Sequence, residues 1–273
     1  MNGLKTALLL GVLTGLFLYV GEAFGGDQGM IVALIFSIIL NFGSYFFSDK
    51  IALASYGAVP VTREQAPDFY ATVERLSQKA NIPMPRLYVI PSPALNAFAT
   101  GRNPAHAAVA ATEGILRALS SEELEGVVGH ELSHVINRDI LTSSIAATLG
   151  GTISFLARQA MWFGGGRRDN RDSGLFALIA APFAAMLIQL MVSRSREYEA
   201  DASGARLVGY PNGLISALRK LEAAAGQIPL AGAAPATAHL CIVNPFRGGG
   251  LGGLFSTHPP LEKRIARLME MSR

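Results

Sequence analysis

Four long apolar runs divide the 273-residue chain and constrain its fold more than any other feature. They cover residues 6–24, 30–47, 140–163 and 175–192. Each approaches the ~20 residues with which a helix crosses ~30 Å of hydrocarbon. Only 16% of the residues are charged, whereas an ordinary soluble domain has about 25%. We therefore predict an integral membrane protein with about four transmembrane helices.

The positions of lysine and arginine predict how the first two runs are oriented. The connection between them, GGDQG, contains neither residue, whereas Lys5 and Lys50 flank the pair on the other side. Because cytoplasmic helix ends carry an excess of basic residues, both ends of this hairpin should face the cytoplasm. We expect a multi-pass protein in the bilayer of the cell (inner or plasma) membrane, with its polar region in the cytoplasm. Three arginines between the last two runs, Arg167, Arg168 and Arg171, leave open whether the second hairpin crosses fully.

The polar regions predict one α+β domain that the second hairpin interrupts. Three short strands are expected before the interruption, RLYVI at 86–90, then NAFAT, and then AAVAA at 107–111. Thr62 and Gln65 have the spacing of a capping box that starts a helix. The predicted parts are a transmembrane hairpin at 1–48, a half-domain at 49–139, a second transmembrane hairpin at 140–192 and a second half-domain at 193–273.

The stretch GHELSHVINRD, residues 129–139, carries the most specific chemical signal. Ser120 and Glu123 can form a capping box that starts its helix. His130 and His134, four residues apart, then lie on the same helix face. Two imidazoles at this spacing can share one Zn²⁺ ion, and Glu131 is placed to act as the general base on a water molecule there.

A catalytic zinc site needs a third protein ligand and one open position. The stretch SREYEADA, at 195–202, follows the fourth apolar run and offers Glu197, Glu199 and Asp201. In an antiparallel hairpin, His134 and Glu197 would stand about 9 Å and about 7.5 Å beyond the same membrane edge. These heights do not separate the two glutamates, but only Glu197 shares a helix face with Asp201, whose carboxylate can accept the free ring N–H of a zinc-bound histidine. We predict one zinc ion per chain, held by the two histidines and Glu197.

Composition excludes other classes of protein and of site. The net charge of +3 and the lack of interleaved aromatic and basic residues exclude a nucleic-acid partner. Cys241 is the only cysteine, so the chain forms no internal disulfide and no cysteine-rich zinc site. We expect its thiol to be buried or partly exposed.

Three motifs in chain order, HELSHVINRD, SREYEADA and FSTHPPLEKRI, resemble the HtpX family of membrane-embedded zinc endopeptidases, which are related to the CAAX prenyl proteases. The similarity extends over the whole chain. It implies a gluzincin-like zincin fold that uses the residues named above, with His258 and Arg264 near the scissile carbonyl. It also implies a role in removing misfolded or damaged membrane proteins. The oligomeric state and the natural substrates are not indicated.

A substrate polypeptide, from a membrane protein or an unfolded chain, should lie extended along a strand edge, where backbone hydrogen bonds hold it. An ordinary core strand is the alternative for the same residues. The candidate edge combines AAVAA with the Asn-Ala pair of the preceding NAFA, which we expect at positions 95 and 96. The residues of AAVAA that should contact the substrate are Ala107, Ala108, Val109 and Ala110.

Two other functions stay open at this point. One is a catalytically inactive membrane scaffold that binds zinc, although the presence of Glu131 disfavours it. The other is a transporter in which the histidine motif is a coincidence. The first two runs contain only one charged residue, Glu22 near the end of the first, and this disfavours transport, because transported ions need polar residues within the membrane.

Overall fold

The computed structural model of the protein describes residues 2–145, 194–224, 241–242 and 259–271. Residues 140–145 are helical and begin the third apolar run. The rest of the predicted second hairpin lies outside the described residues, and so does His258. The predicted half-domain boundaries therefore stay a prediction.

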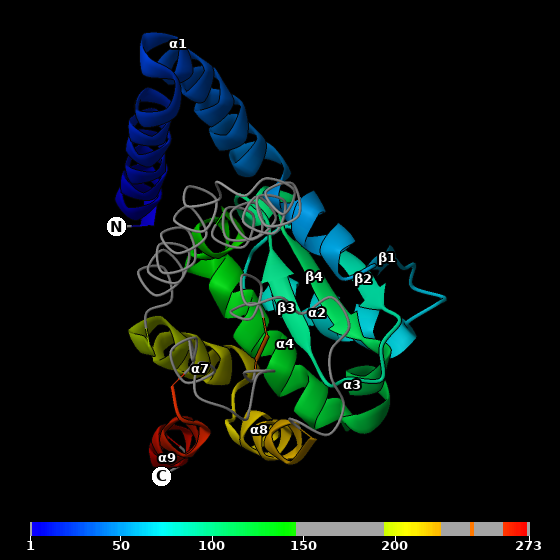
Figure 1. Ribbon diagram of the computed structural model, residues 1–273. Helices are drawn as coiled ribbons and strands as arrows, with labels where there is room; N and C mark the ends of the chain where they lie inside the picture. The colour runs from blue at the N-terminus through cyan, green and yellow to red at the C-terminus, as the bar shows by residue number, and fades with distance from the viewer. Residues whose placement is uncertain (1, 146–193, 225–240, 243–258, 272–273) are drawn as a thin grey trace.

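Helix α1 (Asn2–Ser55) is a helical hairpin that projects from the other described elements (Figure 1). It bends at Gly26, inside the predicted connection, where φ is 57° and ψ is −146°, a conformation that favours glycine. The two arms contact each other through Asn41, whose side-chain amide donates to Thr14 Oγ1 at 2.9 Å. Among the described helices, the arm Gly25–Ser55 is the one that is long and apolar enough to cross a membrane.

A four-stranded sheet in the order β1-β2-β4-β3 forms the middle of the domain. Strands β2 and β4 are parallel, and the other two pairs are antiparallel. The three predicted strands are confirmed, but the prediction that AAVAA lies at an edge is wrong. Strand β4 lies between β2 and β3, so its backbone is paired on both sides, and β3 forms the edge. The strands are β1 (Val59–Pro60), β2 (Arg86–Ile90), β3 (Ala97–Thr100) and β4 (Ala108–Thr112), with a short 3₁₀ turn, η1 (Pro104–His106), before β4.

The predicted substrate contacts just before β3 are wrong by one residue. The Asn-Ala pair of NAFA occupies positions 96 and 97, as Asn96 and Ala97, and position 95 is Leu95. Leu95 is partly buried and packs against the main apolar cluster, and β3 begins only at Ala97. The side chain of Leu95 therefore supports the core, and the open edge consists of the strand that follows it.

Helix α4 (Ser121–Ile136) begins at the predicted capping box. Ser120 Oγ accepts from Glu123 N at 3.3 Å, and Glu123 Oε2 accepts from Ser120 N at 2.8 Å. At the other predicted box, Gln65 Oε1 accepts from Thr62 N at 2.9 Å, as expected. The helix α2 (Pro67–Lys79) begins only after this pair, at a proline whose fixed φ and missing N–H suit the first helical position. Between the sheet and α4, the chain also forms the short helix α3 (Glu113–Ala118).

Helices α7 (Arg194–Val208) and α8 (Asn212–Ala224) pack against α4, and α9 (Leu261–Met271) packs against α7 and α8 (Figure 1). The backbones of α4 and α7 come very close at Gly204, where an added Cβ would lie only 2.8 Å from His130 N. One buried apolar cluster contains residues from both sides of the segment 146–193, from Phe69 to Leu268. The helix that carries the two histidines is thus held directly against the helix that carries Glu197.

Candidate metal centre

The side chains of His130, His134 and Glu197 converge on one point. The two Nε2 atoms are 3.2 Å apart, and the Glu197 carboxylate oxygens lie 3.8 Å from His130 Nε2 and 3.7 Å from His134 Nε2. Two bonds of ~2.0–2.1 Å at a tetrahedral angle place ligand atoms about 3.3–3.4 Å apart. The three donors therefore fit around one zinc-sized ion, and they come from α4 and α7 as the sequence predicts.

Each histidine uses its other ring nitrogen to contact a buried carboxylate. His130 Nδ1 lies 2.9 Å from Asp201 Oδ1, and His134 Nδ1 lies 3.2 Å from both oxygens of Asp139. Because a carboxylate accepts, Nδ1 of each ring carries the hydrogen and Nε2 presents a lone pair. Two lone pairs that face each other at 3.2 Å repel, so this arrangement is suited to a cation between them.

Asp139 is a site residue that the sequence did not single out. Helix α4 ends at Ile136, and Arg138 then takes a left-handed conformation with φ 55°, which is uncommon for a residue other than glycine. This turn brings Asp139 back beneath His134, where its backbone N–H donates to the His134 carbonyl at 3.2 Å. Its place in the sequence, five residues after the second histidine, is the signal that points to it.

Arg264 is fully buried and holds Asp201. Its Nε donates to Asp201 Oδ2 at 2.8 Å and its Nη2 to Asp201 Oδ1 at 2.6 Å. Burial would raise the pKa of Asp201, but the charge and hydrogen bonds of Arg264 outweigh burial and lower the pKa to about 2. Nη1 donates to the Ile242 carbonyl at 3.2 Å. The place near the scissile carbonyl that the resemblance gives Arg264 stays a prediction, and these contacts add a positioning role behind His130 and Glu197, whose Oε2 lies 3.8 Å from Arg264 Nη1.

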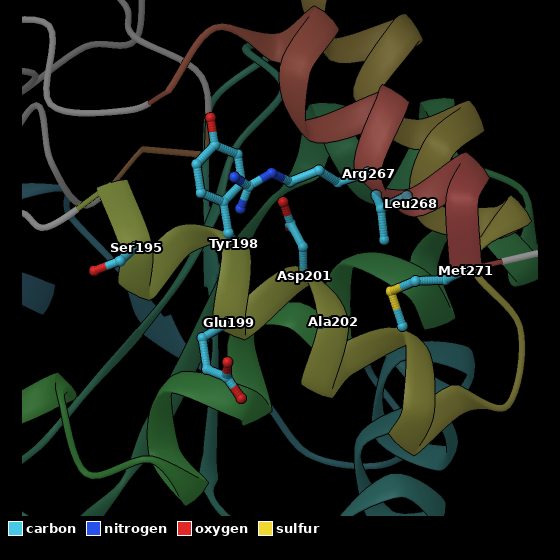
Figure 2. Close-up of a pocket in the computed structure, with 8 residues that line it drawn as sticks. All are labelled: Ser195, Tyr198, Glu199, Asp201, Ala202, Arg267, Leu268 and Met271. Atoms are coloured by element: carbon cyan, nitrogen blue, oxygen red, sulfur yellow. The ribbon is translucent and has the colours of Figure 1, made fainter.

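The two glutamates that the sequence offered as third ligands have different surroundings. The Glu197 side chain is 8% exposed and faces the histidines, whereas the Glu199 side chain is 63% exposed and pairs with Arg206 at 3.3 Å. Figure 2 shows Asp201 directed toward α9 and Glu199 directed away from it, along the groove of about 470 Å³ between α7 and α9. The structure therefore brings Glu197, and not Glu199, to the metal centre.

Glu131 lies at the same centre and contacts the edge strand. Its Oε2 accepts from the backbone N–H of Ala99 on β3 at 2.8 Å. Burial raises the pKa of this carboxyl, although the neighbouring histidines oppose the shift. A raised pKa makes Glu131 a stronger base than an exposed glutamate.

A cavity of about 40 Å³ joins Glu131, the three metal-binding side chains and β3. It has room for an ion with a water molecule, since water occupies about 30 Å³ in the liquid. Cys241 lines the same cavity, and burial raises the pKa of its thiol to about 12. The thiol is therefore buried, as the sequence predicts, and neutral.

Residues 63–272 match peptidase family M48, and the matched segment contains every residue of this centre. The chain belongs to peptidase family M48. Its similarity to HtpX proteases extends over nearly the whole chain. It is 53% identical to the protease HtpX homolog of Syntrophobacter fumaroxidans, with 98% of each chain covered. It is 54% identical to that of Persephonella marina, with 100% of this chain and 98% of the relative covered.

The fold of this M48 peptidase is also similar to a solved structure. It matches the crystal structure of Ste24p from S. mikatae with a TM-score of 0.54 and 20% sequence identity. The match covers 94% of this chain and 62% of Ste24p. The predicted relationship to the HtpX family is thus confirmed, and the chain is a metallopeptidase whose described residues supply a fitting set of metal ligands.

Proposed function

We propose that this M48 peptidase is a membrane-bound zinc endopeptidase. The observation that carries the proposal is the convergence of the two Nε2 atoms and the Glu197 carboxylate beside the buried Glu131. Nitrogen and oxygen donors in this geometry suit Zn²⁺, and three protein ligands leave one position open, which is the pattern of catalytic zinc sites. When bound, zinc would supply Lewis-acid charge to polarise a carbonyl and acidify water.

Glu131 is the general base of the proposed reaction. It accepts a proton from the attacking water molecule and then delivers that proton to the amine that leaves. The Ala99 N–H fixes the orientation of its carboxylate, so little reorganisation is needed when the proton moves. His258, which the family resemblance places near the scissile carbonyl, would stabilise the negative charge that develops there.

The edge strand β3 is the proposed binding site for the substrate backbone. The Thr112 N–H donates to the Asn96 carbonyl at 2.9 Å, so alternate residues from Asn96 onward turn their backbone groups toward β4. Ala97 and Ala99 consequently turn theirs toward the open edge, beside Glu131. A peptide that adds to this edge would be held by its backbone, which permits many sequences to be cleaved.

The position of the centre supports a membrane location for the substrates. The arm Gly25–Ser55 of α1, which is long enough to span a membrane, leads directly into the domain that carries the metal centre. With Lys5 and Lys50 on the same side of the first hairpin, we propose about four membrane-crossing helices in the cell membrane and a cytoplasmic metal centre. Misfolded or damaged membrane proteins, and unfolded chains, are the proposed substrates.

The test compares wild type with four variants, all purified in detergent without zinc and then reloaded. Wild type and Glu199→Gln should bind about one zinc ion and cleave an unfolded membrane-protein substrate. Glu131→Gln should bind the same amount of zinc, yet cleave about 10²–10⁴-fold more slowly. Zinc binding without cleavage by wild type would establish an inactive scaffold instead, and equal zinc loss in Glu197→Ala and Glu199→Ala would refute the ligand set.

A further inference from the structure

A second, larger cavity lies where α1 joins the sheet domain, on different residues from the metal centre. Its volume is about 570 Å³. Its walls come from the end of α1, from the residues around the start of β2 and from the turn between β3 and β4. The cavity therefore lies between α1, which is long enough to span a membrane, and the turn that follows β3, the strand beside the metal centre.

One wall of this junction cavity is aromatic. Phe42, Phe46 and Phe47 lie on α1, with 60%, 39% and 46% of their surfaces exposed. They stand at the end of the second apolar run. About 20 helical residues span the ~30 Å of hydrocarbon, so in a membrane these rings lie near the boundary between acyl chains and headgroups.

The other wall is cationic. Lys50, Arg86 and Arg102 line it, and Asp49 is the one carboxylate among the lining residues of this cavity. Asp49 is paired with Arg86 at 2.6 Å. The wall thus has a net charge of +2. Among the described lining residues, no carboxylate balances the charge of Lys50 or that of Arg102, because Asp49 is paired with Arg86.

Arg102 is held in place for an incoming anion. His106 Nε2 lies 2.8 Å from Arg102 Nη2, and Asn103 Oδ1 lies 2.8 Å from His106 Nδ1. A hydrogen on Nδ1 satisfies Asn103 and leaves Nε2 to accept from the arginine. The guanidinium also lies 5.3 Å from the centre of the Phe46 ring. A side chain that is already ordered loses little entropy when it binds a ligand.

We propose that the junction cavity binds the headgroup of an anionic phospholipid. The phosphate lies between Lys50 and Arg102, which supply a compact charge and a planar set of N–H donors, and the start of the acyl chains lies along Phe42 and Phe46. Basic pockets beside membrane helices bind anionic headgroups in this way. The aromatic wall favours a lipid over free phosphate, because a soluble anion gains nothing from exposed rings.

The test uses the full chain, loaded with zinc, in a detergent with an uncharged headgroup. Phosphatidylglycerol or phosphatidylcholine is titrated in, and bound lipid is counted by native mass spectrometry. Wild type should retain one phosphatidylglycerol in preference to phosphatidylcholine, and a large excess of inorganic phosphate should not displace it. Arg102→Gln and Lys50→Gln should each weaken binding about fivefold, which corresponds to about 1 kcal/mol per basic residue near an anionic surface.

Two further variants control the experiment. Arg102→Lys keeps the charge and should retain most of the binding. Arg117→Gln removes an exposed arginine on α3, at the end of the domain away from α1 (Figure 1), and should bind like wild type. Equal binding of the two lipids, displacement by inorganic phosphate, or an equal loss in Arg117→Gln would each overturn the proposal. The zinc content of each variant shows whether it has folded. If Arg102→Gln loses zinc, the result rests on Lys50→Gln, because Lys50 is exposed on α1 and its replacement should not disturb the fold.

Discussion

Arg264 donates one hydrogen bond to each carboxylate oxygen of Asp201, in a place where both side chains are buried. Asp201 in turn accepts from Nδ1 of His130, which turns the opposite ring nitrogen toward the metal position. The orientation of a metal-binding histidine therefore depends on a residue of α9 whose guanidinium has no lone pair with which to bind a cation.

Replacing Arg264 should reduce both stability and zinc affinity. Arg264→Met leaves the Asp201 carboxylate buried without its partner, which costs about 3–5 kcal/mol. Loss of such a supporting contact also weakens metal binding about 10–100-fold. Thermal unfolding and zinc titration of the protein in detergent measure the two effects, and Arg264→Lys should fall between wild type and Arg264→Met in both.

A double variant separates the positioning role from general stability. In Arg264→Met with Asp201→Leu, no charge is left unpaired, so much of the lost stability should return. Zinc affinity should stay low, because Asp201→Leu removes the carboxylate that orients His130. Recovery of zinc affinity together with stability would show that Arg264 acts only through the fold.

Asp139 should support His134 as Asp201 supports His130. Asp139→Ala removes the acceptor for the ring N–H, and we expect zinc affinity to fall about 10–100-fold. Asp139→Asn keeps an oxygen acceptor and should recover part of the loss. Glu199→Gln removes an exposed carboxylate and serves as the control in a competition titration with a chelator. An Asp139→Ala protein with the zinc affinity of wild type would contradict this role.

The close contact of α4 and α7 at Gly204 should not tolerate a side chain. A Cβ there would lie 2.8 Å from His130 N and 2.9 Å from the Gly129 carbonyl carbon, so Gly204→Val must push α7 away. Overpacking of this kind costs about 1–3 kcal/mol, and it would move Glu197 from the histidines. Zinc content should fall in Gly204→Val and stay unchanged in the control Ser203→Val, which alters the adjacent, partly exposed residue.

Glu123 should make stability depend on pH in the acid range. Burial would raise its pKa, but hydrogen bonds from Lys220 at 2.7 Å, Ser216 at 2.7 Å and the Ser120 N–H lower it to about 2. A depressed folded pKa contributes stability above the unfolded value of 4.5, and this contribution is lost as pH falls toward 2. We expect about 1–2 kcal/mol, because Lys220 is half exposed and partly screened.

Thermal unfolding of wild type and Glu123→Gln at several pH values measures this contribution. The gap between the two proteins should be widest near neutral pH, should narrow below about pH 4.5 and should close as the pH approaches 2. Other acid-sensitive carboxylates affect both proteins equally, so the difference isolates Glu123. A gap that does not change with pH would mean that the pairing of Glu123 with Lys220 contributes no charge-dependent stability.

Features that depend on spacing along one helix could be predicted from the sequence. The capping box of Ser120 and Glu123 and the shared face of His130 and His134 follow from 3.6 residues per turn, whatever the rest of the chain does. The choice of Glu197 over Glu199 used the same regularity, since Asp201 lies one turn beyond Glu197. The three short strands followed from short, mainly apolar runs between turn residues, although only RLYVI is rich in β-branched residues.

Features that depend on tertiary contacts could not be predicted. Strands that follow each other in sequence usually pair, yet β4 enters between β2 and β3, which moves the edge from AAVAA to β3. Asp139 reaches His134 only because Arg138 takes a left-handed conformation that no residue type signals. An arginine is rarely buried without a partner, and the partner of Arg264 is 63 residues away.

The metal-binding side chains lie on both sides of the third and fourth apolar runs, since His134 precedes them and Glu197 follows them. During biosynthesis, the two histidines therefore leave the ribosome long before the carboxylate that completes the set. The set of metal ligands stays incomplete, and the protein latent, until the chain has been synthesised beyond Glu197. The nascent chain and its neighbours are thereby spared from premature cleavage.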